Sequence, residues 1–162
     1  MKKHILPLIP TLFFMTTVYA AEIVVPIYTT DSAAKQVGNV VFLDTDYGLL
    51  VSPRLTSLPP GLHGFHLHQH ADCSEHGADA GGHYDPQNTN SHLGPYGQGH
   101  LGDLPVLYVN ADGTADTTTL APRLKTSDVK GLSVMIHAEG DNYSNTPPLG
   151  GGGARIACGA IK

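Results

Sequence analysis

The sequence predicts an all-β protein, either an antiparallel sandwich or a barrel, and three observations lead to this class. Short runs rich in Val, Ile, Leu, Thr and Tyr recur along the chain. Gly, Pro, Asn and Asp separate these runs, and the 162 residues include 19 glycines and 12 prolines. Apolar residues at helical spacing are almost absent. Many short apolar runs divided by turn residues are typical of β-sandwiches and β-barrels.

The first predicted strands cover residues 22–28, 38–45 and 48–53, where β-branched and other apolar side chains dominate. The next covers residues 64–68, Gly-Phe-His-Leu-His, in which apolar side chains alternate with histidines. Such alternation indicates a strand whose two faces have different surroundings.

Further strands are predicted at 104–109, 115–120 and 132–137. Asn-Ala-Asp-Gly at 110–113 predicts a hairpin turn between the first two, because Asp-Gly adopts the positive φ angles of tight turns. The run Leu-Ser-Val-Met-Ile-His at 132–137 is almost continuously apolar and indicates a buried strand. No repeat or linker divides the chain, so residues 21–162 are expected to form one domain.

Two segments, 69–103 and 138–155, are too rich in Gly, Pro, Asn and Asp to form strands. Both exceed the usual length of connections in compact domains, and long loops of this kind are commonly functional. The first also carries five histidines. We therefore expect it to bind something rather than to serve as a passive connection.

The first twenty residues have the features of a secretory signal peptide. Lys2 and Lys3 precede an apolar stretch at 5–18 that two prolines interrupt, and Val-Tyr-Ala at 18–20 fits a cleavage site. Cleavage is expected after Ala20; a buried N-terminal helix is the alternative. No other stretch is long and apolar enough to cross a bilayer.

The charge balance excludes nucleic acid as a partner. The formal net charge is −5, and removal of Lys2 and Lys3 would make it −7. Binding to phosphate groups requires a basic surface.

The two cysteines, Cys73 and Cys158, are expected to form a disulfide because the protein is predicted to be exported. Two free thiols or two metal ligands are the alternatives that the residues leave open.

Ligand-type side chains accumulate in this sequence. His66 and His68 lie two apart in a predicted strand, so their imidazoles share one face. Five more follow at His83, His92, His100, Asp103 and His137. A lone histidine is more often a core residue, but so many among glycines indicate a metal site. Imidazole suits zinc and copper, and a carboxylate favours zinc; seven side chains serve two four-coordinate ions only if one imidazole bridges them.

Four segments carry a resemblance to a known family: GLHGFHLHQHADC at 61–73, AGGHYDPQNTNSHLGPYGQGHLGDLP at 80–105, MIHAEGDNYSN at 135–145 and PLGGGGARIACGAI at 148–161. With them, the sequence resembles copper–zinc superoxide dismutases of the bacterial periplasmic type over essentially all of 21–162. The resemblance implies an eight-stranded antiparallel Greek-key β-barrel with two long functional loops. It also implies a periplasmic enzyme that converts superoxide to dioxygen and hydrogen peroxide.

The resemblance further implies a role for each matching residue. The implied copper ligands are His66, His68, His83 and His137. The implied zinc ligands are His83, His92, His100 and Asp103, so that His83 bridges both ions, leaves copper with a proton on reduction and returns it on reoxidation. Asp141 falls on a carboxylate that connects one copper ligand with one zinc ligand, and Cys73 and Cys158 fall on the intrasubunit disulfide. Arg155 falls on the arginine beside the copper channel.

We expect Arg155 to carry most of the attraction for the superoxide anion. Between His68 and Arg155 the only basic residues are Arg123, Lys125 and Lys130, all outside the two long loops. His63 is expected to have a structural role. His70 and His76 match no ligand and are expected to be exposed loop residues, with a weak accessory metal site as the alternative.

Two other functions compete with the enzyme. A periplasmic module that stores copper and zinc would need the same ligands but not Arg155, and a pure β-sandwich adhesin would need none of them. A homodimer is possible for either metal protein, and neither a membrane nor a nucleic acid is expected as a partner.

Overall fold

The computed structural model describes residues 22–162, so the predicted signal peptide at 1–20 lies outside the described residues. Nine strands are found in this part of the chain: β1 Glu22–Thr29, β2 Gln36–Thr45, β3 Gly48–Leu55, β4 Gly61–His63, β5 Phe65–His68, β6 Leu107–Val109, β7 Thr119–Ala121, β8 Ser133–His137 and β9 Arg155–Ala160. The helical segments are short: η1 Glu75–Ala80, α1 Thr126–Val129 and η2 Pro148–Gly151. The predicted all-β class is confirmed. None of the helices is long and apolar enough to span a membrane within residues 22–162.

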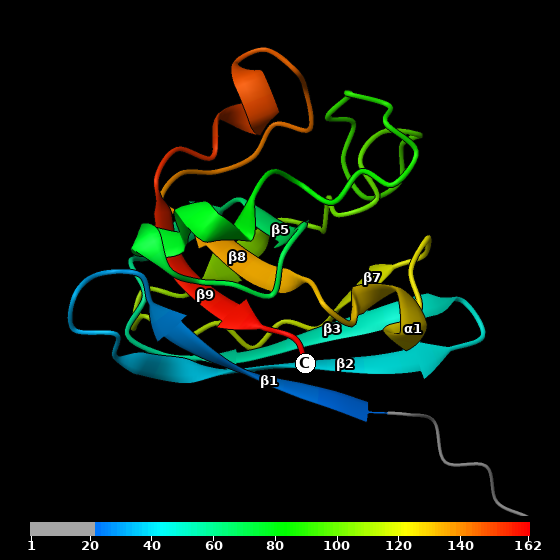
Figure 1. Cartoon of the computed structure of the whole chain (residues 1–162). Coiled ribbons are helices and arrows are strands. Elements are labelled where there is room, and N and C mark those ends of the chain that lie inside the picture. Colours follow the sequence, from blue (N-terminus) through cyan, green and yellow to red (C-terminus); the bar gives the residue numbers. More distant parts are fainter. Residues whose placement is uncertain (1–21) are drawn as a thin grey trace, which may run out of the picture.

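Seven strands form one antiparallel sheet in the order β5-β8-β9-β1-β2-β3-β7, and β4 pairs with β6 in a second, smaller sheet. The larger sheet curls, and β9 from the end of the chain lies beside β1 from its beginning (Figure 1). Only Gly64 separates β4 from β5, so the chain passes between the sheets at this point. If β4 and β5 are counted as one interrupted strand, the structure has the eight expected strands.

Two strands were absent from those predicted by pattern. The strand β4 has three residues, too few for a recognisable alternation. The strand β9 begins at Arg155, inside the segment predicted as the second long loop, and it is held by pairing with β8 and β1. Its stability comes from these non-local hydrogen bonds, which local composition does not reveal.

The predicted hairpin at 110–113 is only half right. The turn itself forms, with the N–H of Gly113 donating to the carbonyl of Asn110 at 2.9 Å. The flanking strands do not pair with each other, however, because β6 joins β4 and β7 joins β3. The reason is that Ala115, just after the turn, pairs with Leu55 and draws the chain to the edge of the larger sheet.

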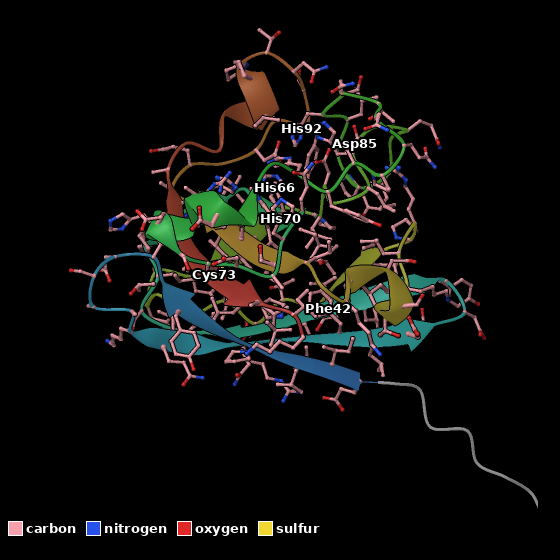
Figure 2. The ribbon with its side chains drawn as sticks, viewed as in Figure 1. Phe42, His66, His70, Cys73, Asp85 and His92 are labelled. Atoms are coloured by element: carbon pink, nitrogen blue, oxygen red, sulfur yellow. A yellow bond between two sulfur atoms is a disulfide. The ribbon has the colours of Figure 1, made fainter. Side chains whose placement is uncertain are left out.

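The strands β5 and β8 are buried on both faces, so the histidines that they carry are enclosed within the protein. Along β5, Phe65 and Leu67 enter the main apolar core, whereas His66 and His68 point to the opposite face. The two long loops rise from one side of the sheet (Figure 1). In Figure 2, His66 and His92 lie on that side, whereas Phe42 lies among β1–β3 on the other. The loops therefore cover the outer face of β5 and β8 and enclose polar side chains there.

Candidate metal centre

Four histidines from three parts of the chain meet above β5 and β8. His66 and His68 come from β5, His137 ends β8, and His83 comes from the first long loop. One ring nitrogen of each lies within 4.8 Å of those of the other three. A single backbone bridge between His68 and His83 holds the loop against β5 at this point.

A second group of side chains lies beside the first and is centred on Asp103. Its Oδ1 is 3.1 Å from His83 Nδ1, 3.0 Å from His92 Nδ1 and 3.4 Å from His100 Nδ1. A backbone bridge between His66 and Asp103 fixes the carboxylate next to β5. His83 thus belongs to both groups.

The structure brings all seven predicted ligand side chains together, with one difference in detail. The mutually close ligand atoms of the second group belong to His66, His83, His92 and Asp103. The sequence predicted His100 in the place of His66. His100 nevertheless borders this group through its contact with Asp103.

Asp141 lies behind both groups and connects them. Its Oδ2 accepts a hydrogen bond from His66 Nε2 at 2.7 Å, and its Oδ1 accepts one from His92 Nε2 at 2.8 Å. The side chain of Asp141 is 1% exposed. Gly150, with φ +72°, packs so tightly here that a Cβ would overlap Asp141 Oδ1, which explains the glycine.

Unpartnered nitrogen atoms show that the cluster fits metal ions. His66 Nδ1 and His83 Nε2 are buried without a hydrogen-bond partner, and His92 Nδ1 and His100 Nδ1 are buried with the Asp103 carboxylate close by but without hydrogen-bond geometry to it. Leaving such atoms unsatisfied costs about 1–3 kcal/mol each, so native proteins seldom do so without reason. Lone pairs that converge beside a carboxylate are the donor set that copper and zinc prefer.

Burial keeps the first group neutral in the metal-free chain. It lowers the pKa of His66 to about 3, that of His68 to about 2 and that of His137 to about 4. Neutral imidazole is the form that binds metal. At pH 7 these three rings therefore need not lose a proton before they bind.

The carboxylates reverse this effect in the second group. Burial lowers the pKa of His92, but Asp103 and Asp141 outweigh it and raise the pKa to about 9. For Asp103 and Asp141, burial raises the pKa of the carboxyl group. Hydrogen bonds and charges from the neighbouring histidines outweigh burial, so both pKa values lie well below the usual range. The centre thus holds two carboxylates in their charged form.

His63 is buried but lies outside the metal-ligand groups. Its Nδ1 is 2.7 Å from the carbonyl oxygen of His137, and its Nε2 is 2.8 Å from that of Pro59. Both ring nitrogens face acceptors, so neither is left for a metal. This arrangement fits the structural role expected for His63.

His70 and His76 are exposed, and neither belongs to a group of potential metal ligands within residues 22–162. His76 Nδ1 donates to the carbonyl of Thr30 at 2.7 Å. A cavity of about 640 Å³ adjoins His76, and none of the seven ligand-type side chains lines it. The chemistry therefore does not lie in that cavity.

Arg155 lies at the start of β9, opposite His137 in the ladder with β8. Its Nη1 donates to the carbonyls of Gly77 and Ala78, and its Nη2 donates to that of Gly81 at 2.6 Å. The same Gly81 oxygen accepts a hydrogen bond from His68 Nδ1 at 2.9 Å. The guanidinium is thus fixed beside the first group of histidines.

The disulfide between Cys73 and Cys158 joins the first long loop to β9, across 85 residues of sequence. Cys158 pairs with Met135 of β8 in the sheet. The loop whose carbonyls hold Arg155 is therefore tied to the strand that carries Arg155.

Two residues of the second long loop were missed by sequence reasoning. Asn145 Oδ1 accepts a hydrogen bond from the backbone N–H of His92 at 2.8 Å. The hydroxyl of Tyr143 accepts one from the N–H of Val106 at 2.8 Å. These contacts join residues that are 53 and 37 positions apart in the sequence. Contacts between residues so far apart cannot be predicted from a local sequence pattern.

Residues 36–161 match the model of the copper/zinc superoxide dismutase family. The chain belongs to the copper/zinc superoxide dismutase family. It is 60% identical, over the full length of both chains, to the superoxide dismutase [Cu-Zn] of Legionella pneumophila. The structure of the enzyme from Brucella abortus superposes with a TM-score of 0.83 at 45% identity, covering 88% of this chain and 100% of that one.

A second solved relative, the monomeric copper, zinc superoxide dismutase of Salmonella enterica, has a TM-score of 0.75 and 50% identity, with coverage of 88% and 100%. The predicted family, enzyme class and cofactors are therefore confirmed. As a superoxide dismutase, the protein converts superoxide to dioxygen and hydrogen peroxide with copper and zinc. A storage protein without this activity is not favoured.

Proposed function

We propose that the two groups of side chains divide the metal ions as the sequence predicted. The copper ligands are His66, His68, His83 and His137. The zinc ligands are His83, His92, His100 and Asp103. The observation that supports this division is that in most of these histidines one ring nitrogen is engaged elsewhere, which leaves one specific atom for the metal.

In the copper group, hydrogen bonds select the ligand atoms. His66 gives its Nε2 hydrogen to Asp141, and this leaves Nδ1 for the metal. His68 and His137 give their Nδ1 hydrogens to the carbonyls of Gly81 and Gly153, and this leaves Nε2. Those two Nε2 atoms face each other at 3.4 Å, a distance that suits two donors turned toward a common ion. Such hydrogen bonds also fix the orientation of ligand rings.

His83 is the bridging ligand in this proposal. Its Nε2 is buried without a hydrogen-bond partner, and one of its ring nitrogens lies within 4.8 Å of one from each of His66, His68 and His137. Its Nδ1 lies 3.1 Å from Asp103, on the zinc side. If this one ring offers a nitrogen to each ion, seven side chains are enough to give two ions four ligands each.

His100, rather than His66, is proposed as the remaining zinc ligand. His66 has only Nδ1 free, because its Nε2 donates to Asp141, and the proposal above gives Nδ1 to copper. His100 Nδ1 is buried, unpartnered and 3.4 Å from Asp103 Oδ1.

Copper held by His66, His68, His83 and His137 would supply one-electron redox chemistry for superoxide, and zinc held beside it would supply a positive charge without redox chemistry. The chain contributes binding, orientation and protons. Peroxide formation consumes protons, and His83 Nε2 is placed to hold one as a general acid. Arg155 presents a fixed positive charge that attracts the superoxide anion to this face.

Metal analysis and ligand variants test the division. His100→Ala is expected to weaken zinc binding and leave copper binding almost unchanged, and His70→Ala, in the same loop but outside both groups, serves as the control. Dismutase activity is measured before and after chelation and after each metal is restored. Anomalous scattering that places the two ions apart, rather than on either side of His83, would overturn the proposal.

We also propose that residues 1–20 are a signal peptide and that the mature enzyme resides in the periplasm. The bacterial relatives and the charged-then-apolar start of the chain support this. Mass spectrometry of the protein from a periplasmic extract should show an N-terminus at Ala21. An intact N-terminus in the cytoplasmic fraction would contradict it.

A homodimer is proposed through the face formed by β4 and β6. Leu62 and Tyr108 are cross-strand neighbours there, and they are 55% and 52% exposed. A second copy that covers them would remove apolar surface from water. Light scattering should give twice the chain mass, and Leu62→Lys should restore the monomer; a wild-type monomer at high concentration would refute the proposal.

A further inference from the structure

The ring of His100 has the weakest support among the proposed ligand histidines: within residues 22–162 its Nδ1 makes no hydrogen bond and lies 3.4 Å from Asp103 Oδ1. Four of the others donate a hydrogen from one ring nitrogen, His66 and His92 to Asp141 and His68 and His137 to backbone carbonyls. The fifth, His83, contacts Asp103 and faces both groups. Within residues 22–162, the ring of His100 makes no such hydrogen bond.

His100 is also the least enclosed residue of its group. Its side chain is 9% exposed, whereas those of His83, His92 and Asp103 are 2% exposed or less. A ring without a hydrogen bond at the edge of a site has more rotational freedom than one that is held. Ligand orientation must then come from the main chain.

The main chain at His100 is held from two sides. Its N–H donates to the carbonyl of Ser91 at 2.8 Å. Its carbonyl accepts a hydrogen bond from Arg123 Nη1 at 3.3 Å, and the preceding carbonyl, of Gly99, accepts one from Arg123 Nη2 at 2.9 Å. The guanidinium therefore binds two consecutive peptide groups through two N–H donors whose relative direction is fixed by its planar geometry.

Arg123 is itself well anchored. It follows β7, and the next residue, Leu124, is 1% exposed within the main core. The N–H of Leu124 donates to the carbonyl of Ala121 at 3.3 Å, closing the turn after β7. The first long loop is thus tied, at the ligand that needs support, to the rigid sheet.

We propose that Arg123 is a positioning residue for the zinc site, which fixes the backbone of His100 and through it the direction of the imidazole. This inference rests on the proposed assignment of His100 to zinc. Arg123 touches neither ion; it acts only through His100. Its contribution is the donation of two hydrogen bonds to adjacent carbonyl oxygens.

The test compares the zinc affinities of variants of the mature protein, residues 21–162, by competition with a chromophoric zinc chelator. Arg123→Gln is expected to raise the dissociation constant for zinc about tenfold, in the range found for groups that orient metal ligands. The affinity for copper should change less than twofold. Arg54→Gln, which removes an exposed arginine on β3, is the matched control and should change neither.

A double variant separates positioning from general loosening. In a His100→Ala background, Arg123→Gln should weaken zinc binding no further, because the residue through which it acts has gone. Cobalt placed in the zinc site should show altered d–d absorption in Arg123→Gln and not in Arg54→Gln. Arg123→Lys keeps the charge without the fork and should lie between wild type and Arg123→Gln; it replaces the glutamine variant if that variant does not fold.

Three results would overturn the inference: zinc affinity of Arg123→Gln within twofold of wild type, equal losses of copper and zinc, or additive losses in the double variant. Unchanged zinc affinity in His100→Ala alone would instead refute the assignment of His100. The two failures are therefore distinguishable.

Discussion

Replacement of Asp141 by asparagine tests how the two metal sites are coupled. The carboxylate accepts hydrogen bonds from His66 Nε2 and from His92 Nε2, on opposite sides of the cluster. Asparagine has one oxygen for these two N–H donors, and its amide NH₂ faces the other donor. The ring that loses its acceptor is then free to move its hydrogen to Nδ1, the atom proposed to bind metal.

The size of the effect follows from the loss of one such bond. A hydrogen bond to a charged group contributes about 1.5–3 kcal/mol. Since 1.4 kcal/mol is a factor of ten, the affinity for the affected metal should fall roughly 10- to 150-fold. The remaining ring keeps a weaker, uncharged acceptor, so the affinity for the second metal should fall by less.

The assay is chelator competition for copper and for zinc in Asp141→Asn, followed by dismutase activity at saturating metal. Asp116→Asn, an exposed aspartate outside the long loops, is the control and should leave both affinities unchanged. If both affinities of Asp141→Asn stay within twofold of wild type, Asp141 does not orient the ligands and the reasoning is wrong.

Three further predictions follow from other parts of the fold. Arg155→Ala should lower kcat/KM for superoxide roughly tenfold and flatten its dependence on ionic strength, because the fixed charge beside His68 is lost; stopped-flow rates from low to high salt that keep the wild-type slope would contradict this. Joint replacement of Cys73 and Cys158 by serine should lower the free energy of unfolding of the metal-free chain by up to about 4–5 kcal/mol, since the bond closes an 85-residue separation; a loss below about 1 kcal/mol in urea titrations would show that the unfolded chain gains little freedom. Hydrogen bonds from the Thr126 side chain and N–H hold the pKa of Asp44 below its usual value, so its stabilising effect is present above the unfolded pKa and is lost as pH falls through the folded one. Asp44→Ala should therefore cost about 1–2 kcal/mol at pH 7 and less at pH 3, and an equal cost at both would exclude the charged form as the cause.

Local pattern was a sound guide to the strands and a poor guide to their partners. The runs at 38–45 and 48–53 became β2 and β3 with nearly the expected bounds, because alternation and β-branched content act over a few residues. The turn at 110–113 formed, yet its flanking strands joined different sheets. Pairing depends on contacts with distant segments, which a local turn signal does not contain.

The candidate site shows the same division. The seven ligand-type residues could be named from their chemistry, their spacing and the family resemblance. The grip of Arg123 on Gly99 and His100 spans 24 and 23 residues and joins a residue that looked irrelevant to the loop it supports. Every residue has a backbone carbonyl, so the residue types alone do not show which carbonyls an arginine side chain will bind.

The sequence by itself determined the all-β class, the family and the seven ligand-type side chains from which a metal centre could be predicted, because each depends on which side chains are present and how they are spaced. Tertiary structure alone decided which ring nitrogens are engaged in hydrogen bonds and which carbonyls accept from Arg155 and Arg123. These are properties of orientation, and orientation is set by hydrogen bonds between segments that meet only when the loops close over β5 and β8.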